Sequence, residues 1–192
     1  MKPRITIVHG IHTDDNANWM DYFVLRFREA GFAARKWTYG YAYALLTRWQ
    51  NPGRARKLAA LLHPGEIVLG HSNGGCLAWM AAELGAKIGG AILLNPALDT
   101  DKVMAPHVPW VNLYANRHDD AVSIAGILPA HPWGPQGRDG IERFDERYRT
   151  VFSDNGLDSR PAPAVAGHSA ILEPQVIDAW ASRVIADAKA RL

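Results

Sequence analysis

The feature that most constrains the fold is the stretch of residues 66–83, EIVLGHSNGGCLAWMAAE. It has the pattern of a short buried strand, a serine between glycines and a helix of small residues. A strand that turns directly into a helix holds its corner residue, Ser72, in a strained conformation and lifts the hydroxyl clear of the sheet. Gly70 and Gly74 allow the two elements to pass closely without Cβ clashes. A glycine-rich loop that cradles an anion before a helix is the alternative interpretation.

Strand-like and helix-like segments alternate along the rest of the chain. Further strands are predicted at residues 4–10, 32–39, 89–94, 111–115 and 148–152, and the continuous apolar runs in 4–10 and 89–94 indicate strands buried on both faces. Helices are expected at residues 19–30, at 51–62 with Asn51 as N-cap and Pro52 in the first turn, and at 174–192. This alternation predicts an α/β fold with a doubly wound, mostly parallel sheet and helices on both faces.

Composition narrows the classes of protein that fit. The chain of 192 residues is expected to form one domain, residues 1–192, with a full hydrophobic core. A net charge of +2 and a single short basic cluster, Arg54, Arg56 and Lys57, which fits a solvated helix face, argue against nucleic-acid binding. The one cysteine, Cys76, excludes an internal disulfide and is expected to fill the core. Neither a membrane span nor a signal peptide is indicated, so we expect a cytoplasmic protein.

Two kinds of residue that can activate a serine follow Ser72 along the chain. A serine hydroxyl is a poor nucleophile until a base takes its proton, and that base needs an acid to orient it. After the predicted strand at 111–115 the chain reads NRHDDAV, which supplies Asp119 and Asp120. The last histidine of the chain, His168, lies in a loop ahead of the final helix. Alternatively, both aspartates only cap the loop, and the histidine is an ordinary imidazole in a surface loop.

Taken together, these motifs resemble the α/β-hydrolase superfamily, and most nearly its compact serine esterases and lipases with a minimal cap. Residues 70–74 fit the G-x-S-x-G nucleophile elbow of that family, whose triad follows the order serine, acid, histidine. Family members commonly place the acid three residues before a small apolar residue, which selects Asp119 with Val122 and leaves Asp120 as the alternative acid. The family often has glycine where this chain has Asn116.

The resemblance extends to the base and to an oxyanion hole. The sequence G-H-S around His168 is similar to the terminal histidine loop of the family. An oxyanion hole needs two N–H donors aimed at the charge that grows on the tetrahedral intermediate. The resemblance assigns one donor to the backbone of Asn73, and VHGIH at residues 8–12 resembles the His-Gly oxyanion motif, which assigns the other to Ile11. A plain turn at the end of the strand is the alternative for that motif.

The remaining features bear on cofactors and on the substrate. No zinc-binding spacing is present, so neither a metal nor a cofactor is expected. The irregular segment of residues 123–140 is interpreted either as a small lid or as an ordinary crossover connection. Tyr39, Tyr41, Tyr43 and the tryptophans are candidates to line an acyl or aromatic pocket, although most are expected in the core. His71 is expected to serve in packing or local hydrogen bonding.

The sequence therefore predicts a serine hydrolase that cleaves small-molecule carboxylic esters through an acyl-enzyme on Ser72. His168 would act as the base and Asp119 as its acid. A thioesterase, amidase or acyltransferase with the same triad is one alternative, since the leaving group is not visible in these motifs. A catalytically idle binding module with the same fold is the other.

Overall fold

A single sheet organises the chain, which is described here from a computed structural model for residues 2–11, 18–40, 44–122, 133–154 and 162–192. The described strands are β1 (Arg4–Val8), β2 (Ala33–Trp37), β3 (Ile67–His71), β4 (Gly90–Leu94), β5 (Val111–Ala115) and β6 (Tyr148–Phe152). They lie in the order β2-β1-β3-β4-β5-β6, and every neighbouring pair is parallel. The predicted parallel sheet is confirmed.

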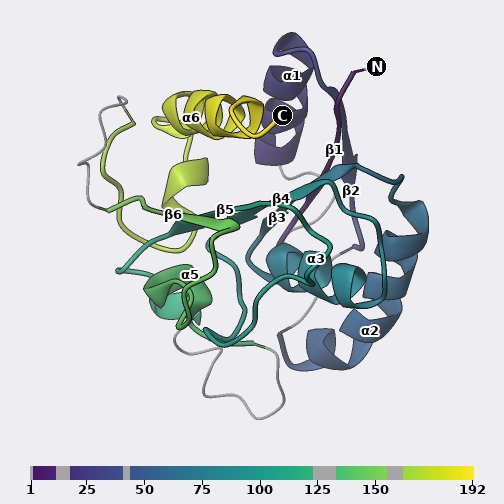
Figure 1. Cartoon of the computed structure of the whole chain (residues 1–192). Helices are drawn as coiled ribbons and strands as arrows, with labels where there is room; N and C mark the ends of the chain where they lie inside the picture. Colours follow the sequence, from purple (N-terminus) through teal and green to yellow (C-terminus); the bar gives the residue numbers. More distant parts are fainter. Residues whose placement is uncertain (1, 12–17, 41–43, 123–132, 155–161) are drawn as a thin grey trace.

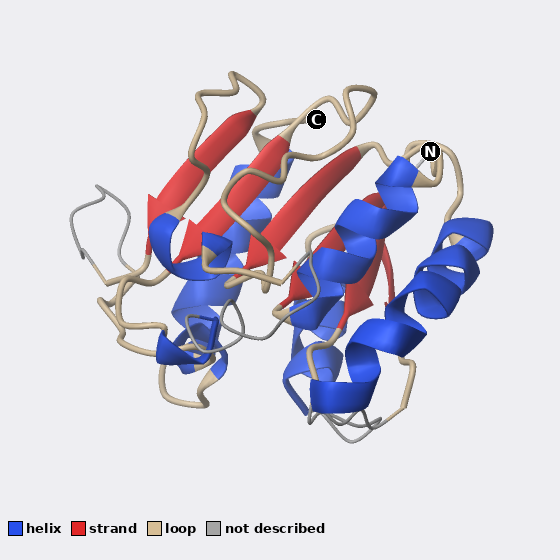
Figure 2. Cartoon of the chain, turned by 90° about the horizontal axis from the view of Figure 1, so that it is seen from below, coloured by secondary structure: helices blue, strands red, loops and turns tan. Residues whose placement is uncertain are grey.

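Helices cover both faces of this sheet, as Figures 1 and 2 show. One face is covered by α1 (Asn18–Glu29) and α6 (Ile177–Lys189), and the other by α2 (Ala44–Leu61) and α3 (Asn73–Glu83). Because successive side chains of a strand point to opposite faces, each strand contributes to both hydrophobic layers. Strand residues toward α1 and α6 include Ile5, Ile7, Ile67, Leu69, Ile92 and Leu94, and those toward α2 and α3 include Val8, Val68, Ala91, Leu93, Val111 and Leu113.

The start of α2 differs from the sequence prediction. The helix begins at Ala44 rather than at Asn51, and Pro52 lies inside it. The prediction was wrong because Asn51 does not cap the helix: its side chain is buried and donates a hydrogen bond to Asn73 Oδ1 at 2.7 Å. That tertiary contact outweighs the local preference of an Asn-Pro pair for a helix start.

The turn from β3 into α3 has the predicted strained geometry. Ser72 has φ 54° and ψ −122°, a backbone conformation that L-residues rarely adopt. The two glycines of the motif lie where side chains do not fit. A Cβ on Gly70 would stand 2.6 Å from the backbone of Gly74, and one on Gly74 would stand 2.4 Å from the Val8 carbonyl oxygen. These close approaches hold α3 against β1 and β3.

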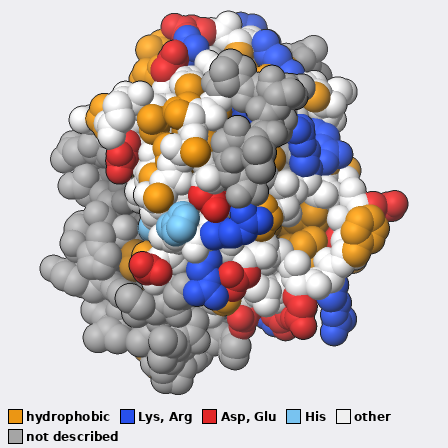
Figure 3. All heavy atoms as spheres, turned by 90° about the vertical axis from the view of Figure 1, so that its left-hand side faces the viewer, with side chains coloured by type: hydrophobic (Ala, Val, Ile, Leu, Met, Phe, Trp, Pro, Cys, Tyr) orange, Lys and Arg blue, Asp and Glu red, His pale blue; other side chains and the backbone are white. Residues whose placement is uncertain are grey.

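The remaining segments and the surface complete the fold. The segment 123–132, most of the proposed lid, lies outside the described residues; the rest of 123–140 includes the short helix α5 (Gln136–Asp139). A 3₁₀ turn at Ala170–Leu172 precedes α6. No helix in the described part of the chain is long and apolar enough to cross a membrane. On the face of Figure 3, at the β6 side of the sheet, acidic and basic side chains are interspersed.

The tight passage of α3 past β1 predicts a large cost for a single methyl group. Gly74→Ala should lower the free energy of unfolding by about 2–3 kcal/mol, because the backbone of β1 cannot move aside cheaply. Gly53→Ala is the matched control, since Gly53 lies in helix α2 with no atom near its Cβ position, and it should raise stability by about 0.5–1 kcal/mol. Urea unfolding of the two variants measures both effects. Equal stability of the two variants would contradict the close approach.

Candidate active site

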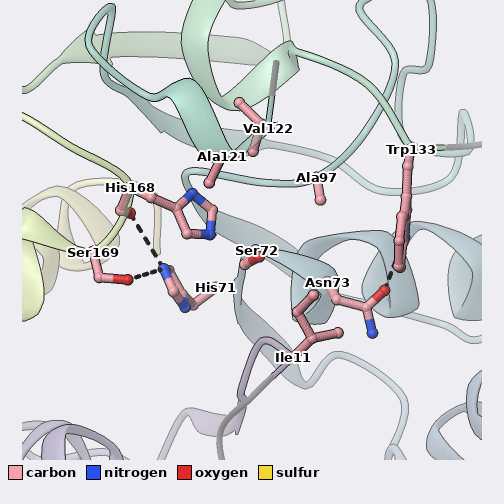
Figure 4. A pocket seen from close by; sticks show the side chains of 10 residues that line it. All are labelled: Ile11, His71, Ser72, Asn73, Ala97, Ala121, Val122, Trp133, His168 and Ser169. Atoms are coloured by element: carbon pink, nitrogen blue, oxygen red, sulfur yellow. Dashed lines mark hydrogen bonds between the residues drawn. The ribbon is translucent and has the colours of Figure 1, made fainter. Parts of the chain in front are cut away.

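A cavity of about 370 Å³ opens beside Ser72 at the carboxyl ends of the parallel strands. Ligands of open α/β sheets bind at this edge, because the loops that follow the strands converge there. The loops after β1, β3, β4 and β5 and the segment ahead of α6 all contribute to its wall. The lining residues are Ile11, His71, Ser72, Asn73, Ala97, Ala121, Val122, Trp133, His168 and Ser169 (Figure 4).

The acid loop after β5 brings Asp119, not Asp120, to the histidine. His168 Nδ1 lies 2.7 Å from Asp119 Oδ2. Asp119 is fully buried, and its other oxygen accepts a hydrogen bond from the Val122 N–H at 3.2 Å. Asp120 is exposed to solvent. Of the two candidate acids, Asp119 therefore has the geometry to orient the imidazole.

Ser72 and His168 line the same cavity, and Figure 4 shows the imidazole of His168 next to the serine side chain. Within the described part of the chain, no hydrogen bond joins the two side chains. Bonds of this kind are often long without substrate and tighten when the reacting group is bound. Ser72 also stands at the N-cap of α3, where the helix dipole favours negative charge.

Both residues assigned to the oxyanion hole face the cavity. Asn73 is the first residue of α3, so its backbone N–H has no acceptor within the helix. Ile11 follows β1 in a loop that packs tightly on the serine: a Cβ on Gly10 would stand 2.9 Å from the Ser72 Cβ. The two residues that the sequence singled out thus line the cavity from segments that follow different strands.

The side chain of Asn73 carries a role that the sequence analysis missed. Its Oδ1 accepts hydrogen bonds from Asn51 Nδ2 at 2.7 Å and from Trp133 Nε1 at 3.0 Å. Its Nδ2 donates to the Tyr39 hydroxyl at 3.0 Å and to Asn51 Oδ1 at 3.3 Å. A buried amide with all its bonds made has one orientation, so this network fixes the residue that follows the nucleophile.

Tyr39 connects this network to His9, which directly follows β1. Its hydroxyl donates to the His9 carbonyl at 3.1 Å, and its ring stacks on the His9 imidazole with centroids 4.0 Å apart. Burial raises the pKa of Tyr39, so the phenol remains a donor. Tyr39 is not among the cavity-lining residues, and Tyr41 and Tyr43 lie outside the described residues.

The predicted basic face of α2 is only partly solvated. Arg56 and Lys57 are exposed. Arg54 instead lies over the Tyr39 ring, with its guanidinium carbon 4.6 Å from the ring centroid. Burial lowers the pKa of Arg54. The expectation of a wholly solvated cluster was therefore wrong for Arg54, which packs on Tyr39.

Asn116 stands where the family often has glycine, and its side chain links the acid loop to the histidine loop. Its Nδ2 donates to Ser153 Oγ at 2.8 Å and to the Val165 carbonyl at 2.9 Å. Its Oδ1 accepts from the backbone N–H of His118 at 3.0 Å and of Gly167 at 3.2 Å. The bond to Gly167 holds the residue next to His168. Its departure from the family pattern was the one sequence signal of this role.

Asn95, at the end of β4, supports the acid. It is buried in a left-handed conformation with φ 44°, and its Nδ2 donates to Asp119 Oδ2 at 3.1 Å and to the Gly137 carbonyl at 3.3 Å. The same carboxylate oxygen therefore accepts bonds from Asn95 and His168. Nothing in the sequence alone distinguished Asn95 from an ordinary turn residue.

His71 is a buried neutral imidazole directly before the nucleophile. Burial, and to a lesser extent the nearby His168, lowers its pKa to about 3. Its Nε2 lies 3.4 Å from the His168 carbonyl oxygen and 3.5 Å from Ser169 Oγ. Its ring packs edge-on against Trp19 with centroids 5.7 Å apart. The packing role expected for His71 matches these contacts, which also join the elbow to the histidine loop.

In the described part of the chain, no three His, Cys, Asp or Glu side chains cluster as ligands for a metal ion. Cys76 is fully buried, and burial raises the pKa of its thiol to about 12. A thiol with such a pKa is protonated at neutral pH and is a poor nucleophile. Ser72 is thus the candidate nucleophile of the cavity.

Known structures share this fold. No protein-family model matches the sequence, and no curated protein matches it. Among solved structures, a protein assigned to the α/β-hydrolase superfamily from Xanthomonas campestris pv. campestris is 16% identical, with 100% of both chains covered and a TM-score of 0.55. The esterase domain of a Rhodothermus marinus protein is 14% identical over 98% of this chain and 86% of its own, with a TM-score of 0.56. Esterase RhEst1 from Rhodococcus sp. ECU1013 is 10% identical over 98% and 90%, with a TM-score of 0.57. At these identities the structural similarity establishes the fold alone, and the architecture of the chain is that of the α/β-hydrolases.

The buried state of His71 predicts a specific acid sensitivity. Its pKa of about 3 lies below the ordinary value of 6.5, so the unfolded chain binds a proton that the folded chain does not. The stability that the neutral imidazole contributes is nearly complete above pH 6.5 and is lost as the pH falls toward 3, by about 1.4 kcal/mol per pH unit below about pH 6. Between pH 7 and pH 5 the wild type should therefore lose about 2 kcal/mol more than His71→Gln in urea unfolding. An equal loss of unfolding free energy in the two proteins between pH 7 and pH 5 would contradict a neutral, buried His71.

Proposed function

We propose that the protein is a serine hydrolase that cleaves carboxylic esters of small molecules, with Ser72 as nucleophile, His168 as base and Asp119 as the acid that orients it. The observation that carries the proposal is the 2.7 Å contact between His168 Nδ1 and the fully buried Asp119, in a cavity that also holds Ser72. The esterases of the same fold from Rhodothermus marinus and Rhodococcus add support.

The reaction proceeds in two halves. His168 takes the Ser72 proton while Oγ attacks the ester carbonyl carbon, and Asp119 stabilises the imidazolium that forms. The backbone N–H groups of Ile11 and Asn73 receive the negative charge on the carbonyl oxygen. When the intermediate collapses, the bond to the alcohol oxygen breaks and His168 delivers the proton to it, which leaves an acyl-enzyme.

Water then hydrolyses the acyl-enzyme, and His168 again acts as the base. His168 accepts a proton from the water as its oxygen attacks the acyl carbon, and then returns that proton to Ser72 Oγ as the carboxylic acid leaves. No cofactor is needed for either half. A buried acid aimed at the imidazole favours this chemistry over the idle binding module, which has no use for an oriented His168 beside a strained Ser72.

Substitutions of the serine and of the two neighbouring aspartates test the proposal with p-nitrophenyl acetate as substrate. Ser72→Ala should lower kcat by about 10³-fold or more, and Asp119→Asn by about 10²- to 10⁴-fold, because the imidazole loses its orientation. Asp120→Asn is the matched control and should stay within about twofold of the wild type, since its side chain is exposed. Wild-type turnover by Ser72→Ala, or equal losses in the two aspartate variants, would rule out this assignment.

A further inference from the structure

The two sides of Ser72 differ in chemistry (Figure 4). His168, His71 and Ser169 lie on one side and present imidazole and hydroxyl groups, with the apolar Ala121 and Val122 next to His168. Trp133 lies on the opposite side, beyond Asn73, and this part of the wall is apolar. A substrate that spans the serine therefore meets imidazole and hydroxyl groups at one end and the Trp133 indole at the other.

The proposed reaction fixes which end of an ester occupies each side. The base that takes the serine proton later delivers it to the leaving oxygen, so the alcohol portion must lie next to His168. The carbonyl oxygen points to the N–H groups assigned to Ile11 and Asn73. The acyl chain then extends away from His168, toward Trp133.

Trp133 is held rigidly at the end of that path. Its side chain is 5% exposed and packs in an apolar cluster with Cys76, Ala97, Leu98 and Val122. Its Nε1 donates to Asn73 Oδ1 at 3.0 Å, and that oxygen is itself fixed by Asn51 at 2.7 Å. An indole that is packed on its apolar atoms and hydrogen-bonded through its N–H cannot swing aside without losing that packing and the partner of its N–H.

We propose that Trp133 is a specificity-determining residue that closes the acyl side of the cavity and restricts the enzyme to esters of short, apolar acyl groups. This inference rests on the proposed function, because the acyl side is defined by the roles of Ser72 and His168. The Asn73 side chain links the wall to the oxyanion hole, since the residue that orients Trp133 also supplies one of the proposed N–H donors.

Acyl-chain profiles of two Trp133 variants test the proposal, with p-nitrophenyl acetate, butyrate and octanoate as substrates. The wild type should have a higher kcat/KM for acetate and butyrate than for octanoate. Trp133→Ala removes the wall and should raise the octanoate-to-acetate ratio of kcat/KM about tenfold or more. Trp133→Phe keeps an aromatic wall but loses the N–H, so the ratio should stay within about threefold while the rates for all three esters fall together.

Two further measurements keep the test decisive. Ala97→Val adds bulk to the same apolar wall and should lower the butyrate-to-acetate ratio, which gives a readout if Trp133→Ala fails to fold. Phenyl, p-nitrophenyl and 1-naphthyl acetates vary only the alcohol, and their relative rates should not change in Trp133→Ala. A changed alcohol preference, or an unchanged acyl preference in an active and folded Trp133→Ala, would overturn the proposal.

The outcomes separate this inference from the proposed function. If the wild type hydrolyses no ester of either series, the proposed function is wrong, and the inference fails with it. The same holds if Ser72→Ala hydrolyses the esters as fast as the wild type does. A wild type whose Ser72-dependent activity is highest on octanoate defeats only the inference. Dependence on Ser72 together with the predicted Trp133 shift supports both.

Discussion

The structure depends on the close passage of three backbone segments at Ser72. Strand β3 must turn directly into α3, and α3 must pass within contact of the carbonyl groups that end β1. Glycine at positions 70 and 74 permits this approach, and Ser72 bears the strain with φ 54°. Strain of this kind persists only where the surroundings over-determine it, and here the sheet, the helix and the β1 loop all do so.

Buried side-chain amides hold the loops around that corner. Asn73 and Asn51 orient the start of α3, Asn95 bonds to the acid, and Asn116 ties the acid loop to the segment that carries His168. Each of these side chains is buried and hydrogen-bonded, so each has one favourable orientation. Loops from different strands are thereby fixed relative to one another, which is the pre-organisation that the proposed chemistry requires.

The sequence predicted the features that arise from local patterns. The strands, their parallel arrangement and the strained serine follow from the alternation of strand-like and helix-like segments and from glycine spacing, and all agree with the structure. The sequence also favoured Asp119 over Asp120, and the structure sets Asp119 against His168. The start of α2 at Ala44 and the amide network of Asn73 were missed because they depend on partners 22 or more residues away, which no local pattern encodes.

The proposed chemistry requires that Ser72 is chemically activated, and covalent labelling measures this activation. A fluorophosphonate probe reacts with a serine only when a base withdraws its proton, whatever the natural substrate is. We expect one probe per chain, located on Ser72 by peptide mass mapping, and labelling that is slowed about 10³-fold or more in folded His168→Ala. A well-folded wild type that takes up no probe, or takes it up on another residue, would contradict the account.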